Sequence, residues 1–162
     1  LEDELDQALA AIEMAGITVT KCYAGNVQVL ALPDQLRQAL MNVITNAVQG
    51  MRGSGTLTLS TAQSDHSATA TIADSGPGIS KQHLPKIFDP FFTTKGQGEG
   101  SGLGLTVARR IIRKFGGDVR IESLEGRGTT CTVTLPILAT AAERGPWTPS
   151  VSRSEPEPSP LS

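Results

Sequence analysis

The chain has 162 residues, a formal net charge of −2 and 38% hydrophobic residues. This length suits about one domain, and the small net charge provides no basic field for a nucleic-acid partner. No signal peptide and no apolar run of about 18 residues occurs, so we expect a soluble, cytoplasmic protein. The chain begins without Met inside a helical pattern, which favours a fragment; whether its parent is membrane-anchored stays open.

Two cysteines, Cys22 and Cys131, lie far apart in runs of alternating apolar residues. The sequence contains no C-x-x-C motif. We therefore expect two buried, reduced thiols, with a disulfide or a metal site as the weaker alternative.

The first 32 residues predict one helix and two strands. Residues 1–15 repeat apolar side chains at a four-three spacing and end at Gly16. This pattern suits an ordinary surface helix and the end of a dimerisation helix equally well. Residues 17–23 and 27–32 are β-branched and alternating, and Gly25-Asn26 between them predicts a hairpin or two short strands.

The rest of the ordered chain alternates helices with pairs of strands. We expect helices over 33–50 and 102–115, and strands over 56–62, 67–74, 118–125 and 128–137. Antiparallel hairpins exclude a doubly wound parallel sheet. The predicted fold is an α/β (α+β) two-layer sandwich with a mixed, mostly antiparallel sheet packed on helices. Residues 139–162 are rich in Pro and Ser and predict a flexible tail.

The stretch from Asp74 to Leu105 is rich in glycine and is the central feature of the sequence. It contains DSGPGIS, KIFDPFFTTKGQGEG and SGLGL. Glycine at this density is kept where backbone bends sharply or touches a ligand. A long loop inside a compact domain is usually a functional lid or disordered. We interpret the stretch as a nucleotide pocket with a mobile lid.

Asp74 follows a predicted strand and could accept a hydrogen bond from the exocyclic amine of adenine. Gly76 would let the base lie against the backbone, and Gly78 would allow the next turn. By itself D-x-G-x-G is a weak signal, because Asp and Gly are the commonest turn residues.

Gly100, Gly102 and Gly104 precede or open the second long helix. Free N–H groups at a helix start favour anions, although a flexible loop with a glycine cap would look the same. Lys95 could approach phosphates as a point charge, or could simply be solvated. The Walker pattern and the dinucleotide fingerprint are both missing.

Asn42 and Asn46 stand four residues apart on one side of the helix over 33–50. Asn46 offers an amide oxygen to Mg²⁺, which takes few protein ligands besides waters and phosphates. Taken alone, either could be a surface residue or a satisfied buried amide. Phe88, Phe91 and Phe92 could pin the lid to the body or belong to the core.

Together these segments resemble the catalytic, ATP-binding domain of bacterial sensor histidine kinases. That domain belongs to the superfamily shared with gyrase, heat-shock chaperone and MutL ATPases, which has the Bergerat-type ATP-binding fold. LRQALMNVITNAVQGM is similar to its asparagine box, DSGPGI and GSGLGL to its glycine boxes, and FDPFFTTK to its phenylalanine box. The wording DPFFTTK is most similar to the nitrogen-regulation and C4-dicarboxylate sensor branch.

The resemblance implies ATP and Mg²⁺ as cofactors, with Asn46 as the metal ligand and Asn42, Asn46 and Lys95 as the catalytic residues. It implies nucleotide contacts from Asn42, Asn46, Asp74, Gly76, Gly78, Ile79, Phe88, Thr93, Thr94, Lys95, Gly100, Ser101, Gly102, Leu103, Gly104 and Leu105. Many relatives carry Lys where this chain has Gln49, which puts that phosphate contact in doubt.

The resemblance also implies a different role for each of three segments. Residues 1–15 would end a dimerisation and phosphoacceptor hairpin, 16–138 would form the ATP-binding domain, and 139–162 the tail. The acceptor His is absent, so the implied partners are that hairpin, a response regulator receiver domain and a second copy of the full-length protein. Hydrolysing relatives carry Glu where this chain has Asn42, and an amide is no general base. A hydrolysing ATPase and a nucleotide-dependent binding module or anti-sigma-type Ser kinase are the alternatives.

Overall fold

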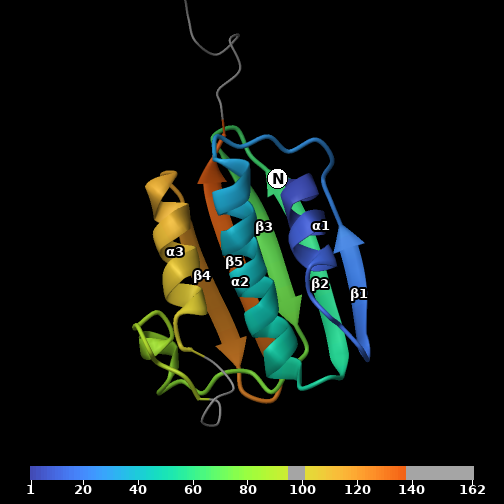
Figure 1. Ribbon diagram of the computed structural model, residues 1–162, viewed down its shortest axis with the longest axis vertical. Coiled ribbons are helices and arrows are strands. Elements are labelled where there is room, and N and C mark those ends of the chain that lie inside the picture. Colours follow the sequence, from blue (N-terminus) through green and yellow to red (C-terminus); the bar gives the residue numbers. More distant parts are fainter. Residues whose placement is uncertain (95–100, 138–162) are drawn as a thin grey trace, which may run out of the picture.

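Helix α2 (Pro33–Met51) lies across a five-stranded sheet whose order is β1-β2-β3-β5-β4. The computed structural model describes residues 1–94 and 101–137. Figure 1 shows α1, α2 and α3 together on one face of the sheet, which gives two layers. The bounds are α1 Glu2–Ala10, β1 Ile17–Cys22, β2 Gly55–Gln63, β3 Ser67–Asp74, the 3₁₀ turn η1 Leu84–Lys86, α3 Gly104–Lys114, β4 Asp118–Leu124 and β5 Gly128–Pro136.

The sheet is mixed, as the sequence predicts. β1 pairs with β2 in parallel, whereas the β2–β3, β3–β5 and β4–β5 pairs are antiparallel. The predicted two-layer sandwich with a mostly antiparallel sheet is therefore confirmed.

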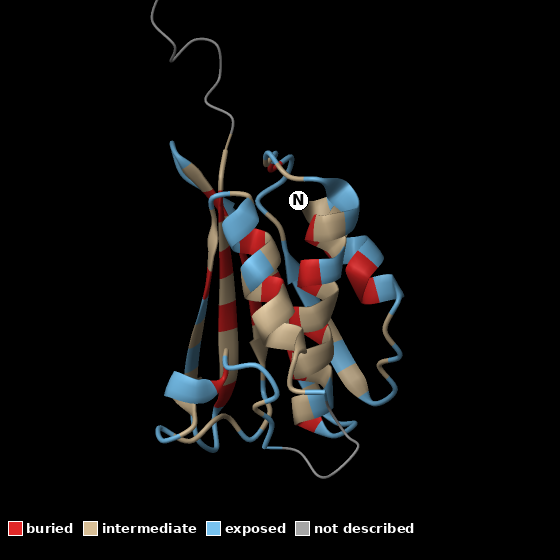
Figure 2. Ribbon diagram, turned by 60° about the vertical axis from the view of Figure 1, so that its left-hand side comes forward, coloured by how far each residue is buried: buried red, intermediate tan, exposed pale blue. Residues whose placement is uncertain are grey.

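The core lies between the helices and one face of the sheet, where Figure 2 shows most of the buried residues. The predicted apolar face of α2 is buried as expected: Leu36, Leu40, Val43, Ile44 and Ala47. Alternation along the strands turns Leu57, Leu59, Ile72 and Val133 toward these residues. Burial of this apolar surface is the main favourable term in folding.

Helix α1 is shorter than predicted, because it ends at Ala10 instead of continuing to residue 15. No residue before Gly16 stops a helix by itself, so the local sequence does not mark this boundary. The chain turns at Ile12, whose N–H donates to the Leu9 carbonyl, before β1 begins. Within α1, Leu5, Ala8 and Leu9 are buried in the same core as α2.

The predicted strand over 27–32 is wrong. That segment connects β1 to α2 without joining the sheet, although Val27 is buried. The N–H groups of Gly25 and Asn26 donate to the Glu2 carboxylate, at 2.8 and 3.0 Å, and do not close a hairpin. β1 takes β2 as its neighbour instead.

Two smaller expectations also need correction. Cys22 is exposed, because it ends the edge strand β1, whereas Cys131 is buried as expected and burial raises its thiol pKa to about 12. Helix α3 begins at Gly104, two residues later than predicted. Within the described ranges, no helix is both long and apolar enough to span a bilayer.

Candidate functional site

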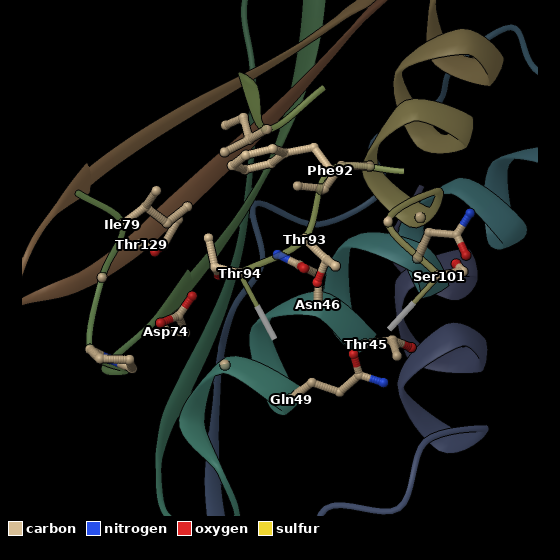
Figure 3. A pocket seen from close by; sticks show the side chains of 18 of the residues that line it. Thr45, Asn46, Gln49, Asp74, Ile79, Phe92, Thr93, Thr94, Ser101 and Thr129 are labelled. Carbon is tan, nitrogen blue, oxygen red and sulfur yellow. The ribbon is translucent and has the colours of Figure 1, made fainter. Parts of the chain in front are cut away.

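A pocket of about 320 Å³ lies where α2, the end of β3 and the start of α3 meet. Figure 3 shows Asp74, Ile79 and Thr129 on one side, Thr45 and Ser101 on the other, and Asn46 between them. The described lining residues are Asn42, Thr45, Asn46, Gln49, Gly50, Arg52, Asp74, Pro77, Gly78, Ile79, Ile87, Phe92, Thr93, Thr94, Ser101, Gly102, Gly104, Leu105 and Thr129.

Asp74 is the last residue of β3, and its carboxylate is held by the backbone. The Gly76 N–H donates to Asp74 Oδ1 at 2.8 Å. Burial raises the pKa of Asp74, while the backbone N–H groups of Gly76 and Thr129 oppose that shift by favouring the ionised form. The pocket thus contains a half-buried acceptor in a fixed orientation.

Gly76 supports Asp74 instead of lining the pocket. A Cβ at Gly76 would lie 2.8 Å from Asp74 Oδ1, so a side chain here would disturb the N–H contact with the carboxylate. The close approach to Asp74 gives one physical reason for glycine here. That a base lies against Gly76 stays a prediction.

The loop after Asp74 is tied to the end of β4 and to the turn between β4 and β5. The Ile79 N–H donates to Ser123 Oγ at 2.8 Å, and the Gly126 N–H donates to the Pro77 carbonyl at 2.7 Å. Gly78 has φ +72, and a Cβ there would overlap the Leu124 carbonyl oxygen. These contacts fix one wall of the pocket.

Helix α2 brings a row of polar side chains to the pocket. Asn42, Thr45, Asn46 and Gln49 all line it, as expected for residues three and four apart on one helical face. Among the described residues, no group of three or more His, Cys, Asp or Glu could hold a metal. The possible metal ligands on these side chains are neutral oxygens, which suit a hard cation that keeps waters and phosphate oxygens as its other ligands.

Phe88 anchors the segment that follows η1 to helix α3. The Thr106 hydroxyl donates to the Phe88 carbonyl at 3.0 Å, and the Arg109 guanidinium lies 4.4 Å from the centre of the Phe88 ring. Arg109 also pairs with Asp118 at 3.3 Å. Burial alone would raise the Asp118 pKa, but bonds from the Val119 N–H and from Arg113 and Arg109 lower it.

Phe91 and Phe92 have different surroundings. Phe91 is 75% exposed, and its N–H donates to the Gly102 carbonyl at 3.0 Å. Gly102 has φ +64, and a Cβ there would lie 2.5 Å from the Phe91 carbonyl carbon. Phe92 lines the pocket, with its ring 5.6 Å from that of His83. The phenylalanines therefore both pin the segment and shape the pocket.

Most of the predicted nucleotide contacts meet in this one pocket: Asn42, Asn46, Asp74, Gly78, Ile79, Thr93, Thr94, Ser101, Gly102, Gly104 and Leu105. Gly76, Phe88 and Leu103 do not line it. Gly76 holds Asp74, Phe88 is bonded to α3, and Leu103 occupies the N-cap position of α3. Lys95 and Gly100 lie outside the described residues, as does the predicted tail over 139–162.

Several lining residues were not anticipated from the motifs. Thr45 could have been found by helical spacing, since it shares the face of Asn42. Thr129 lies opposite Asp74 in the β3–β5 register, which only strand pairing reveals. Gly50, Arg52, Pro77, Ile87 and Phe92 were not predicted as contacts, although all line the pocket. Ser123, outside the pocket, gave no sequence signal for holding Ile79.

Comparison with known proteins now adds the family. Residues 31–139 match the model of the "Histidine kinase-, DNA gyrase B-, and HSP90-like ATPase" family. The chain belongs to this family. The resemblance to an ATP-binding domain noted in the sequence is therefore confirmed.

One curated relative is a sensor histidine kinase. The chain is 39% identical over 113 residues to the sensor histidine kinase ZraS of Escherichia coli strain K12, covering 70% of this chain and 24% of ZraS. The chain thus spans about a quarter of that relative's length.

Solved structures agree with the family assignment. The catalytic domain of histidine kinase ThkA superposes with a TM-score of 0.74 at 28% identity, covering 84% of this chain and 91% of that one. Full-length ShkA in complex with AMPPNP gives 0.72 at 29% identity, covering 83% of this chain and 29% of ShkA. The chain is an ATP-binding catalytic domain of the histidine kinase type. Its placement in the nitrogen-regulation or C4-dicarboxylate branch stays a prediction.

Proposed function

We propose that this domain donates the γ-phosphate of ATP to a His on a dimerisation hairpin outside the described chain, for onward transfer to an Asp of a response regulator receiver domain. The observation that carries the proposal is convergence: Asp74, Asn46 and the start of α3 line one pocket. A hydrogen-bond acceptor, neutral amide oxygens and free helix-start N–H groups suit the base, metal and phosphate parts of one nucleotide.

Each group has a separate task in this proposal. The Asp74 carboxylate, oriented by the Gly76 N–H, accepts from the adenine amine. The Asn42 and Asn46 amides and the N–H groups at the start of α3 hold the phosphates in line for attack. Asn46 would hold magnesium, which when bound supplies positive charge against the charge that develops on the transferred phosphoryl group.

Asn42 favours transfer to another nucleophile over hydrolysis. It lines the pocket beside the start of α3, and its amide cannot take a proton from water at neutral pH. A hydrolysing ATPase would need a base, and the described lining residues include one carboxylate, Asp74, which the proposal assigns to adenine. Phosphoryl transfer then rests on positioning and charge stabilisation.

The proposal is tested by phosphotransfer in trans. The chain is incubated with γ-labelled ATP, magnesium and a purified dimerisation hairpin from a related kinase. We expect label on the hairpin His and none on this chain. A hairpin with its acceptor His→Gln and the chain with Asp74→Asn are the controls, and both should abolish or greatly reduce the label.

Other outcomes would decide between the alternatives. Acid-labile label on the chain alone would contradict the missing-acceptor proposal. Rapid release of phosphate at steady state would favour a hydrolysing ATPase. Tight ATP binding without transfer to any hairpin would favour a nucleotide-dependent binding module. Label on a Ser of an added protein would favour an anti-sigma-type Ser kinase.

The metal role of Asn46 has its own test. We expect Asn46→Ala to weaken ATP binding by about tenfold with magnesium, the usual equivalent of 1.4 kcal/mol. The loss should be smaller in EDTA, because the amide then faces no metal. Calorimetry under both conditions measures the difference, and equal losses would contradict metal coordination.

We extend the proposal to the full-length protein. We propose that it works in the cytoplasm, where ATP is available, as a homodimer whose hairpin helix ends within residues 1–15. The ATP-binding domain would span 16–138, followed by the tail over 139–162. Burial of Leu5 and Ala8 against α2 supports a fixed junction between hairpin and domain. Sedimentation of the full-length protein checks the dimer.

A further inference from the structure

An arginine at the end of α2 lines the pocket but belongs to none of the family motifs quoted above. Arg52 is the C-cap residue of α2. Among the lining residues that the structure describes, it is the one with a positively charged side chain. That side chain is exposed, and it has no ion pair within residues 1–94 and 101–137. Its guanidinium is therefore available to a ligand.

The backbone at Arg52 favours glycine. Its φ is 53° and its ψ 40°, in the left-handed region where a Cβ crowds the following carbonyl. Helices often end in this conformation, and Gly is the usual residue there. The next residue, Gly53, has φ +87. Glycine would adopt the Arg52 conformation without strain, so the local backbone does not explain an arginine at this position.

The residues that follow Arg52 are held by their neighbours. A Cβ at Gly16 would overlap the Gly53 carbonyl oxygen, which shows how closely the two segments pack. On the other side, the Thr56 N–H donates to Ser75 Oγ at 2.9 Å. Strained residues persist where the structure fixes them, and they gather at ligand sites.

Helix α2 runs from one end of the pocket to the other, and Arg52 lies at the Asp74 end. A Cβ at Gly76 would lie 3.5 Å from the Gly50 carbonyl group, which places the end of α2 beside the loop after Asp74. At the other end, the Asn42 carbonyl oxygen is 3.9 Å from a Cβ built on Gly104, at the start of α3. The phosphate end and the base end are therefore different parts of α2.

We propose that Arg52 binds the adenine–ribose part of the nucleotide and so sets affinity at the base end of the pocket. The proposal rests on the ATP-binding role given above. A guanidinium is planar, carries five donors and stacks on aromatic rings, so it can cover a purine face or donate to ring nitrogens and ribose oxygens. Asp74 and Arg52 would then serve one purine as acceptor and donor.

The test is a nucleotide series that varies only in phosphate number. Affinities of Arg52→Gly for AMP, ADP and ATP are measured in EDTA by NMR titration. We expect all three to weaken by a similar factor of about 3–10, the size of a cation–π or charge-assisted contact at a partly exposed site. Relief of the left-handed strain should raise Tm by about 2–4 °C, so loss of fold cannot explain weaker binding.

Two further variants isolate the cause. Arg110→Gln removes the same charge from an exposed position that does not line the pocket, and it should leave all three affinities unchanged. Arg52→Asn tolerates the left-handed backbone without a cation and should behave like Arg52→Gly in binding.

Each remaining outcome overturns the proposal. A loss that grows from AMP to ATP would place Arg52 at the phosphates. A higher Tm with unchanged affinities would make it a helix cap alone. If the unmodified chain bound none of the three nucleotides, the ATP-binding role itself would be contradicted. If the unmodified chain bound them and Arg52→Gly bound them equally well, only the role of Arg52 would be contradicted.

Discussion

The two ends of the pocket are built from different kinds of structure. At the base end, Asp74 terminates a central strand and lies opposite Thr129 in the β3–β5 register. At the phosphate end, the start of α3 is held by a loop, through the bond between the Phe91 N–H and the Gly102 carbonyl. A paired sheet fixes a side chain through many ladder bonds, whereas a loop depends on a few contacts.

This contrast suggests that recognition of the base is preformed and that the phosphate end is easier to disturb. Ser123, Gly76 and the β4–β5 turn all support the Asp74 side. Phe88 and Gly102 support the other side through α3. Variants at the two ends should therefore differ in whether they change affinity, stability or both.

The largest effect is expected at the base end. Asp74→Asn should weaken adenine nucleotide binding by about 1–3 kcal/mol, the cost of losing a hydrogen bond to a charged, partly buried acceptor. The fold should not suffer, because burial raises the pKa of Asp74 and so disfavours the ionised form. Calorimetry gives the affinity and urea unfolding the stability; unchanged affinity would contradict the assigned role.

At the phosphate end, Gly102→Ala should destabilise the domain by about 1–3 kcal/mol, because it combines a strained φ with a clash. Its Cβ would lie 2.5 Å from the Phe91 carbonyl carbon. The matched control is Gly25→Ala, which has φ +86 and no atom within 4 Å of its Cβ.

Comparing the two variants separates strain from contact. Gly25→Ala should lose stability through strain alone, with ATP affinity unchanged, because Gly25 does not line the pocket. Gly102→Ala should lose ATP affinity more than AMP affinity, since it alters the start of α3. Thermal unfolding and the same nucleotide series measure both. Equal behaviour of the two variants would mean that the Phe91–Gly102 contact does not shape the pocket.

A smaller effect is expected where the sheet supports the first glycine box. Ser123→Ala removes a hydroxyl that accepts from the Ile79 N–H and donates to the Gly128 carbonyl, both at 2.8 Å. We expect a loss of about 1 kcal/mol in stability and a slight, equal weakening of AMP and ATP. A loss confined to ATP would show that the two ends are not independent.

The smallest effect concerns pH. The folded-state pKa of Asp74 lies above its unfolded value, so the folded state binds more protons between the two values. The free energy of unfolding should therefore fall as pH rises through that window, relative to Asp74→Asn. Paired urea titrations from pH 3 to 7 would test this, in the approximate range of aspartate titration. An opposite slope would show that hydrogen bonding outweighs burial.

Local sequence rules predicted much of this protein. The apolar periodicity of α2 fixed its buried face and set Asn42 and Asn46 on a common side. Alternation gave β2, β3, β4 and β5 nearly to the residue. The glycine boxes predicted the pocket because glycine is kept where the backbone bends sharply or packs closely.

Tertiary structure decided what local rules left open. The apolar pattern over 27–32 is strand-like, yet Glu2 takes the N–H groups of Gly25 and Asn26 and no ladder forms. Residues 1–15 have helical spacing, but the helix ends at Ala10, where the chain turns toward β1. Pairing of β3 with β5 brought Thr129 to the pocket, and the packing of the end of α2 beside the loop after Asp74 brought Arg52 there. Periodicity depends on neighbours in sequence, whereas these outcomes depend on partners distant along the chain.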